Sequence, residues 1–168
     1  MKQLEFLFKM GENIPLHKKA CAFTGHRQLG EDFSARKLKK EIKQLMEEGV
    51  ENFYNGMAMG FDLIAAEQVL ELKKKFSNVK LVACVPCYGQ EKYFSDEDKK
   101  RYAKVLKKAD EVVTLSDHYY NGCMQKRDRY MADRADVMIA YCKKDEGGAA
   151  YTVKYFSKIK GEGNVIFV

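Results

Sequence analysis

Three glycine-containing turns hold the residues best suited to bind an anion. Thr24–Arg27 places hydrogen-bond donors beside a glycine, Gly56–Asp62 is a turn of small residues, and the Gly147–Gly148 pair follows a charged stretch. Backbone N–H groups at a helix start have no intrahelical acceptor and lie at the positive end of the helix dipole, so a turn that opens into a helix favours phosphate. Any one of these turns could serve only as a tight connection. Three of them at one edge would form a cradle for a phosphate or pyrophosphate.

Apolar segments rich in β-forming residues alternate along the chain with segments of helical periodicity. In the first helical segment, Leu38, Ile42 and Leu45 share one face. Ser95 followed by Asp98 is typical of a capping box at the start of a helix. The predicted strands are Ala20–Phe23, Asn52–Asn55, Lys80–Val85, Glu111–Leu115, Asp136–Tyr141 and Asn164–Val168, and further helices are predicted at Asp62–Phe76, Met124–Arg134 and Ala149–Lys160.

This alternation predicts βαβ units, whose right-handed crossovers produce a parallel sheet covered by helices on both faces. The expected fold class is α/β, a Rossmann-like three-layer sandwich with a mostly parallel sheet of about five to six strands. In such a sheet, ligands bind at the carboxyl ends of the strands, where the strand order reverses. Each glycine turn follows a predicted strand, so all three should lie at this edge. The dinucleotide fingerprint is absent, because the Gly56–Gly60 turn follows the second strand, and the Lys-Ser/Thr pair of a P-loop is absent too.

Length and composition indicate a globular protein. The 168 residues fit one domain, predicted over residues 18–168, with residues 1–17 as an N-terminal extension. No apolar run reaches the ~18–20 residues that span a bilayer, and the N-terminus lacks the apolar core of a signal peptide, so we expect a cytoplasmic protein with no membrane partner. The net charge of +6 is spread over helices whose lysines alternate with glutamates, as on solvated helix faces. A homo-oligomer is compatible with this composition.

The cysteines and histidines do not form a pattern that predicts metal or redox chemistry. Cys84 and Cys87 form a C-x-x-C pair, but Cys84 lies inside an apolar strand and no helix begins at the pair, so a structural role is favoured. The odd total of five cysteines argues against a disulfide framework. His17, His26 and His118 lack ligand spacing, so no metal site is predicted.

Five short motifs follow one another along the chain. They are Thr24–Arg27, Gly56–Asp62 with Ala65, Ala66 and Glu67, Pro86 with Gln90, Asn121–Met124 with Arg127, and Gly147–Gly148 with Tyr151. Together, in this order, they resemble the YpsA-like branch of the SLOG superfamily, and the resemblance covers Cys21 to the carboxyl terminus. It implies a Rossmann-like fold related to the lysine-decarboxylase-like (LOG) proteins and to DprA, and a ligand such as a nucleotide, NAD or ADP-ribose, with no established reaction.

The chain departs from the related patterns at two places. The LOG phosphoribohydrolases carry Pro-Gly-Gly-x-Gly-Thr-x-x-Glu, whereas this chain has Lys154 where that glutamate should be, so the hydrolase glutamate is absent. Within the YpsA-like branch the expected Asn and Thr are replaced by Asp128 and Ala149. Because a carboxylate at position 128 would repel phosphate, Asp128 should face ribose hydroxyls, pair with Arg127 or change the ligand preference.

The leading hypothesis is a protein that binds a nucleotide or a nucleotide-derived ligand, with NAD, ADP-ribose or another nucleotide as the candidates. One alternative is hydrolysis of a nucleotide derivative, with His26 or Asp62 assisting water. A second is DprA-like binding of single-stranded nucleic acid, which a pI of about 8.9 favours only weakly. Asp62 is expected either to cap its helix or to contact a ribose. The predicted ligand-binding residues are Thr24, Gly25, His26, Arg27, Gly56, Met57, Ala58, Gly60, Asp62, Pro86, Gln90, Arg127, Asp128, Gly147, Gly148 and Ala149.

Overall fold

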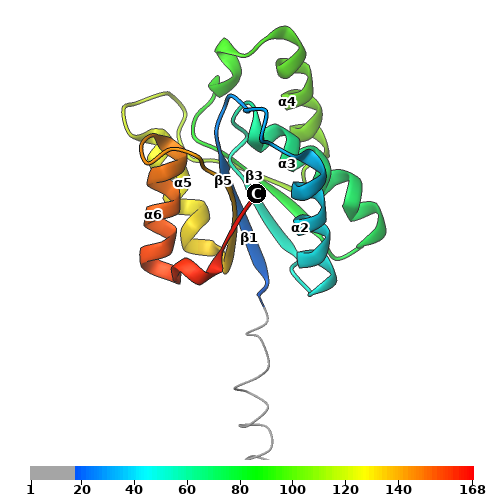
Figure 1. Cartoon of the computed structure of the whole chain (residues 1–168). Helices are drawn as coiled ribbons and strands as arrows, with labels where there is room; N and C mark the ends of the chain where they lie inside the picture. The colour runs from blue at the N-terminus through cyan, green and yellow to red at the C-terminus, as the bar shows by residue number, and fades with distance from the viewer. Residues whose placement is uncertain (1–17) are drawn as a thin grey trace, which may run out of the picture.

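A single six-stranded parallel sheet forms the centre of the molecule (Figure 1). The computed structural model describes residues 18–168, so the predicted N-terminal extension, residues 1–17, lies outside the described residues. The strand order is β4-β3-β2-β1-β5-β6, with every neighbouring pair parallel. The strands are β1 (Ala20–Gly25), β2 (Asn52–Asn55), β3 (Lys80–Val85), β4 (Glu111–Thr114), β5 (Val137–Tyr141) and β6 (Val165–Phe167).

Helices cover both faces of this sheet, which confirms the predicted Rossmann-like three-layer architecture. One face carries α2 (Ala35–Glu47), α3 (Phe61–Leu72) and α4 (Asp96–Lys108), and the other carries α5 (Cys123–Arg134) and α6 (Gly148–Lys160). Short 3₁₀ turns occur at Lys73–Lys75, Gln90–Tyr93 and Glu162–Asn164. None of the helices in the described part combines the length and the hydrophobicity that a membrane crossing requires.

Alternation of side chains along each strand divides the core into two clusters. Phe23 and Phe53 point towards α2 and α3, where their ring centroids lie 6.0 Å apart. Ala22 and Met138 point to the opposite face, towards α5 and α6. Cys84 also lies in this second cluster, and burial raises the pKa of its thiol to about 12, as expected for a core residue rather than a redox thiol. Since the central strands are buried on both faces, their sequences are almost continuously apolar.

The strand order reverses between β1 and β5. The chain places β2, β3 and β4 in succession on one side of β1, and then returns to add β5 and β6 on the other side. The carboxyl ends of β1 and β5 are level, with Thr24 opposite Ala140 and Gly25 opposite Tyr141. The loops that leave these two strands therefore diverge to opposite faces of the sheet and leave a crevice between them.

The predicted helix caps agree with the structure only in part. The Ser95 Oγ accepts a hydrogen bond from the backbone N–H of Asp98 at 3.1 Å, as a capping box requires. The Asp98 carboxylate accepts instead from Arg101 Nη1 at 2.8 Å, so the reciprocal half of the box is replaced by an ion pair. Asp62 is not the N-cap of α3, because the N-cap position is Gly60 and Asp62 lies inside the first turn.

Candidate functional site

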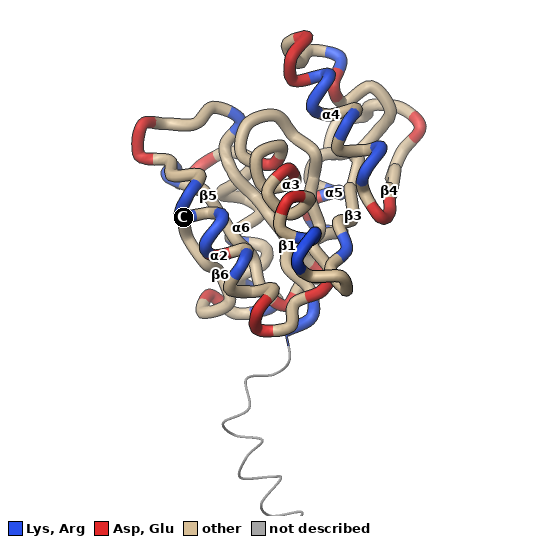
Figure 2. The backbone as a smooth tube through the Cα atoms, turned by 90° about the vertical axis from the view of Figure 1, so that its right-hand side faces the viewer, with Lys and Arg blue, Asp and Glu red and all other residues tan. Residues whose placement is uncertain are grey.

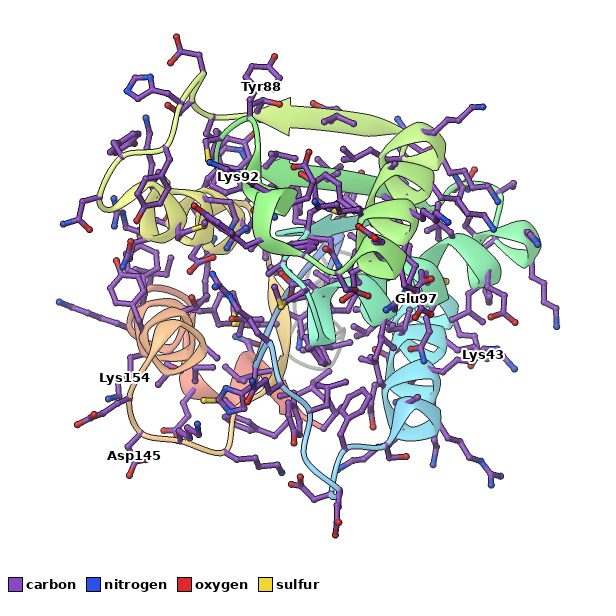
Figure 3. All side chains as sticks on the ribbon, turned by 90° about the horizontal axis from the view of Figure 1, so that it is seen from above. Lys43, Tyr88, Lys92, Glu97, Asp145 and Lys154 are labelled. Carbon is purple, nitrogen blue, oxygen red and sulfur yellow. The ribbon has the colours of Figure 1, made fainter. Side chains whose placement is uncertain are left out.

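A cleft of about 720 Å³ opens at the carboxyl ends of β1 and β5. Figure 3 looks down on this edge of the sheet and places Asp145 and Lys154 beside α6, far from Glu97 of α4. The β1–α2 loop forms one wall of the cleft, and the end of β5 with the start of α6 forms the other. The lining residues are Gly25, His26, Arg27, Gln28, Leu29, Gly30 and Asp32 on the first wall, and Tyr141, Lys143, Lys144, Gly148 and Ala149 on the second.

Tyr141 joins the two walls at the base of the cleft. Its hydroxyl donates to Asp32 Oδ1 at 2.8 Å and accepts from the backbone N–H of Gly30 at 3.1 Å. The Phe33 ring packs edge-on against the Tyr141 ring, with centroids 5.1 Å apart. Lys143 Nζ lies 3.6 Å from Asp32 Oδ2 across the mouth. These contacts hold the β1–α2 loop in a fixed position relative to β5.

His26 connects the same two loops through its ring. Its Nε2 accepts a hydrogen bond from the backbone N–H of Lys143 at 2.8 Å, which places the ring proton on Nδ1. Burial, together with the positive charge of Lys144, lowers the pKa of His26, so the ring is neutral at neutral pH. Because Nε2 is already occupied, His26 serves here as a structural acceptor that orders the β5–α6 loop.

The predicted glycine cradle separates into glycines required by packing and glycines that face open space. A Cβ at Gly25 would overlap the ring of Phe61, and a Cβ at Gly60 would overlap the carbonyl oxygen of Arg27. These two glycines allow the β1–α2 loop to cross closely over the start of α3. Among residues 18–168, a Cβ at Gly147 or Gly148 would meet no atom within 4 Å. The open space therefore lies at the start of α6.

The first turn of α6 presents to the cleft backbone N–H groups that have no acceptor within the helix. Its N-cap is Gly147, which has no side chain to bond the free N–H groups, and the turn contains no acidic residue. Gly148 and Ala149 line the cleft directly. The neighbouring Lys143 and Lys144 add positive charge, so this end of the cleft combines the helix dipole with cationic side chains.

Arg127 lies buried beneath the β2–α3 loop instead of lining the cleft. Its Nε donates to Asp128 Oδ1 at 2.7 Å, and its Nη1 donates to the Gly56 carbonyl and, at 3.2 Å, to Gln90 Oε1. The other carboxylate oxygen of Asp128 accepts from Thr152 Oγ1 at 2.9 Å. Of the three roles expected for Asp128, pairing with Arg127 is therefore the one that the structure contains. A Cβ at Gly56 would lie 2.8 Å from Arg127 Nη1, so this glycine makes room for the guanidinium.

Asp62 forms the second carboxyl group near this guanidinium. Its Oδ2 accepts from the backbone N–H of Ala58 at 3.2 Å, while Oδ1 is buried without a hydrogen-bond partner among the described residues. Burial raises the pKa of Asp62 to about 7, against the opposing attraction of Arg127. Because Asp128 already pairs with Arg127, ionisation of Asp62 would leave the cluster with a net negative charge.

Replacing Asp62 with Asn should make the stability of the protein less dependent on pH. The folded carboxyl, with a pKa near 7, holds a proton that the unfolded chain, with a pKa near 3.8, releases at lower pH. The folded state therefore becomes less stable, relative to the unfolded chain, as pH rises from about 4 to 7. We expect the difference in unfolding free energy between wild type and Asp62→Asn to shift by about 2.5 kcal/mol in favour of the variant from pH 5 to pH 8. Urea titrations at both pH values measure it, and an unchanged difference would contradict the assignment.

The structure distributes the other predicted residues between the cleft and the sheet edge beside it. Thr24, Met57 and Pro86 are buried. Gln90 donates to the Gly56 carbonyl at 3.3 Å and so ties the β3–α4 loop to the β2–α3 loop. Sequence reasoning missed Tyr141 and Asp32, since Tyr141 is the last residue of an apolar strand and Asp32 belongs to no motif. The sequence could have indicated that Lys143 and Lys144 line the site, because they follow the fifth predicted strand.

Comparison with known proteins assigns the family. The family model described as the YspA SLOG family (YpsA) matches residues 25–166. A UPF0398 protein of Brevibacillus brevis is 28% identical over 124 residues, which cover 72% of this chain and 66% of that protein. The UPF0398 protein YpsA of Bacillus subtilis is 28% identical over 146 residues, which cover 79% of this chain and 81% of that protein. The match thus spans about two thirds of the length of the first relative and more of the second.

Two solved structures of DNA processing protein A (DprA) share the fold. The Streptococcus pneumoniae protein superposes with a TM-score of 0.62 at 18% identity, over 89% of this chain and 50% of that one. The Helicobacter pylori protein, whose structure is described as giving insight into its single-stranded DNA binding mode, superposes with a TM-score of 0.64 at 16% identity, over 92% of this chain and 67% of that one. At these identities the likeness concerns the fold alone.

Proposed function

Because this chain belongs to the YpsA family of SLOG proteins, we propose that it binds a nucleotide-type ligand whose phosphate lies at the start of α6 in the cleft between β1 and β5. The observation that carries this proposal is the open space at Gly148, in a cleft where the first turn of α6 has neither a side-chain cap nor an acidic residue. A phosphate there accepts hydrogen bonds from N–H groups that have no acceptor within the helix.

The charge and size of the cleft support the same ligand class. Arg27, Lys143 and Lys144 line it together with one carboxylate, that of Asp32, so the lining is net positive. The volume of about 720 Å³ lies within the range of roughly 300–1,000 Å³ that is usual for small-molecule sites. The phosphate end lies at α6, and the Asp32 carboxylate at the opposite wall accepts hydrogen bonds from ribose hydroxyls. ADP-ribose and NAD carry both groups.

The two groups expected to assist hydrolysis are engaged elsewhere in the fold. The Nε2 of His26 accepts from the Lys143 backbone, and Asp62 is buried below the β2–α3 loop, so neither group is placed to activate water in the cleft. Lys154, at the position of the missing glutamate, donates from Nζ to the Asp145 carbonyl at 2.8 Å. These positions support a binding role.

Replacing Gly148 with Asp should abolish nucleotide binding without unfolding the protein. The new carboxylate would occupy the open space at the phosphate position and repel the ligand. It would not destabilise α6, because a negative charge in the first turn interacts favourably with the helix dipole. Isothermal titration calorimetry with ADP-ribose should give an affinity lowered by about a hundredfold or more, corresponding to roughly 3 kcal/mol, because a desolvated like-charge contact replaces hydrogen bonds. The melting temperature without ligand should be unchanged or higher.

Gly163→Asp is the matched control for this substitution. A Cβ at Gly163 also meets no atom of the described residues within 4 Å, but this glycine lies in the 3₁₀ turn before β6, at the opposite edge of the sheet. The control should bind ADP-ribose as wild type does. Equal binding by Gly148→Asp and wild type would overturn the proposed phosphate position, and a wild type that binds neither ADP-ribose, NAD nor AMP would overturn the ligand class.

Single-stranded nucleic acid is the second candidate ligand. It is favoured by the exposed rings of Tyr88 and Tyr119 on the loops that follow β3 and β4, because bases stack on such rings. Glu91 and Asp117 add negative charge to the same loops, which weakens this candidate relative to the cationic cleft. In the same titrations, an oligothymidylate that binds more tightly than ADP-ribose, with an affinity that falls steeply with salt, would favour nucleic acid.

A further inference from the structure

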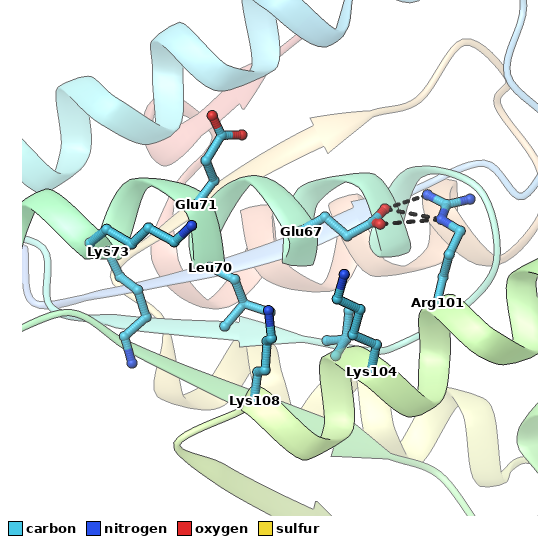
Figure 4. A pocket seen from close by; sticks show the side chains of 9 residues that line it. Glu67, Leu70, Glu71, Lys73, Arg101, Lys104 and Lys108 are labelled. Carbon is cyan, nitrogen blue, oxygen red and sulfur yellow. Dashed lines mark hydrogen bonds and ion pairs between the residues drawn. The ribbon is translucent and has the colours of Figure 1, made fainter.

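A second hollow lies between α3 and α4, on the sheet face opposite α5 and α6 (Figure 4). Its volume is about 480 Å³, and it shares no lining residue with the cleft between β1 and β5. Leu70 of α3 and Val105 of α4 supply its apolar lining. We call it the α3–α4 groove. Its charged lining residues are Glu67, Glu71, Lys73, Lys74, Arg101, Lys104 and Lys108.

Both carboxylates of the groove are already neutralised by cations. Glu67 accepts from Arg101, whose Nε lies 3.1 Å from Glu67 Oε1, and the same guanidinium bonds Asp98 at 2.8 Å through Nη1. Glu71 forms an ion pair with Lys39 of α2 at 2.8 Å. These ion pairs neutralise both carboxylates of the groove, and they use the N–H donors of the Arg101 guanidinium.

Lysine charge in the groove remains uncompensated. Lys73 pairs with Asp110 at 2.6 Å, but within residues 18–168 Lys74, Lys104 and Lys108 form no ion pair. Figure 4 shows the side chains of Lys104 and Lys108 extending from α4 towards α3, with Lys108 beside Leu70. The two lysines are four residues apart, which is about 6 Å along one helix face. Figure 2 shows further basic residues along α4.

We propose that the α3–α4 groove binds an acidic peptide segment of a partner protein, in which an apolar side chain is flanked by carboxylates. Carboxylates meet the unpaired lysine ammonium groups, and the apolar side chain covers Leu70 and Val105. Two observations disfavour a nucleic acid in this groove. Among the described residues, no aromatic side chain lines it to stack a base. The guanidinium of Arg101 already bonds Glu67 and Asp98, so it is not free for a bidentate phosphate contact. This inference is independent of the proposed nucleotide site.

Fluorescence anisotropy with a labelled peptide Glu-Leu-Glu-Glu-Leu-Glu tests this assignment. The probe should bind the wild-type chain, and Lys104→Glu combined with Lys108→Glu should weaken binding by at least about tenfold, because two attractions become repulsions. The charge-reversed peptide Lys-Leu-Lys-Lys-Leu-Lys should in turn bind this double variant better than it binds wild type.

The control variant combines Lys158→Glu with Lys160→Glu in the last turn of α6, on the other sheet face. It changes the net charge by the same amount and should alter the affinity for the acidic peptide by less than about twofold. Circular dichroism checks that both variants fold. If the two variants weakened peptide binding equally, the effect would depend only on net charge, and the groove would not be the binding site. An oligothymidylate that binds more tightly than the peptide, with the same dependence on Lys104 and Lys108, would overturn the peptide in favour of a nucleic acid.

Discussion

Replacing Gly60 with alanine is expected to destabilise the folded protein by about 3 kcal/mol or more. The residue has φ +78° and ψ −119°, a combination that a residue with a Cβ rarely adopts, and its Cβ would overlap the carbonyl oxygen of Arg27. Since the obstructing atom belongs to the backbone, the β1–α2 loop itself would have to move away from α3. Chemical denaturation measures the loss.

Gly89→Ala gives the cost of a Cβ at a left-handed glycine that has no steric overlap. Gly89 has φ +81° and ψ 15°, in the left-handed region, whereas Gly60 combines a similar φ with ψ −119°, and a Cβ at Gly89 would meet no atom of residues 18–168 within 4 Å. We expect a loss of about 1 kcal/mol for this variant, the cost of the left-handed conformation alone. Similar losses for the two variants would mean that the contact between the β1–α2 loop and α3 does not constrain the fold.

Replacing Arg127 with alanine is expected to be as damaging, with a loss of about 3–5 kcal/mol. The guanidinium is buried and bonds Asp128, the Gly56 carbonyl and Gln90. Its removal would leave the Asp128 carboxylate without its countercharge in the protein interior, with Asp62 nearby. Loss of these hydrogen bonds would also release the β2–α3 loop from α5.

Arg129→Ala is the matched control for Arg127→Ala. Arg129 lies two residues further along α5 and donates from Nη1 to the Tyr151 hydroxyl at 2.9 Å on the exposed surface. We expect its replacement to change the unfolding free energy by less than about 0.5 kcal/mol. If urea titration gave equal, small losses for both variants, the buried network would not contribute to the stability of this edge of the sheet.

The strands and helices could be predicted because their signals are local. The apolar run Lys80–Val85 coincides with β3, and Asn164–Val168 contains the shorter β6. Each segment must bury a continuous or periodic set of apolar side chains, whatever its neighbours are. The same alternation predicted that the loops after the strands lie together at the carboxyl edge. Each crossover helix returns the chain to the other end of the sheet, where the next parallel strand begins.

Contacts between segments that are distant in the sequence decide which residues of that edge face the cleft and which are buried. Gly25 has the same local sequence pattern as a phosphate-binding glycine, but the ring of Phe61 occupies the space beside it. The motif of Arg127 predicts a residue that contacts a ligand, whereas folding brings Gly56 and Gln90 to its guanidinium. The hydroxyl of Tyr141 likewise bonds Gly30 and Asp32, which are more than a hundred residues earlier in the chain. Periodicity carries no information about such pairs.

Amide chemical shifts in a titration with inorganic pyrophosphate test most directly whether phosphate binds at the start of α6, as we propose. The resonances of Gly148 and Ala149 should move most and saturate together, with smaller changes at Lys143 and Lys144, while Gly163 stays unchanged. Saturating shifts confined to the α3–α4 groove, or the absence of any saturating shift, would contradict the claim.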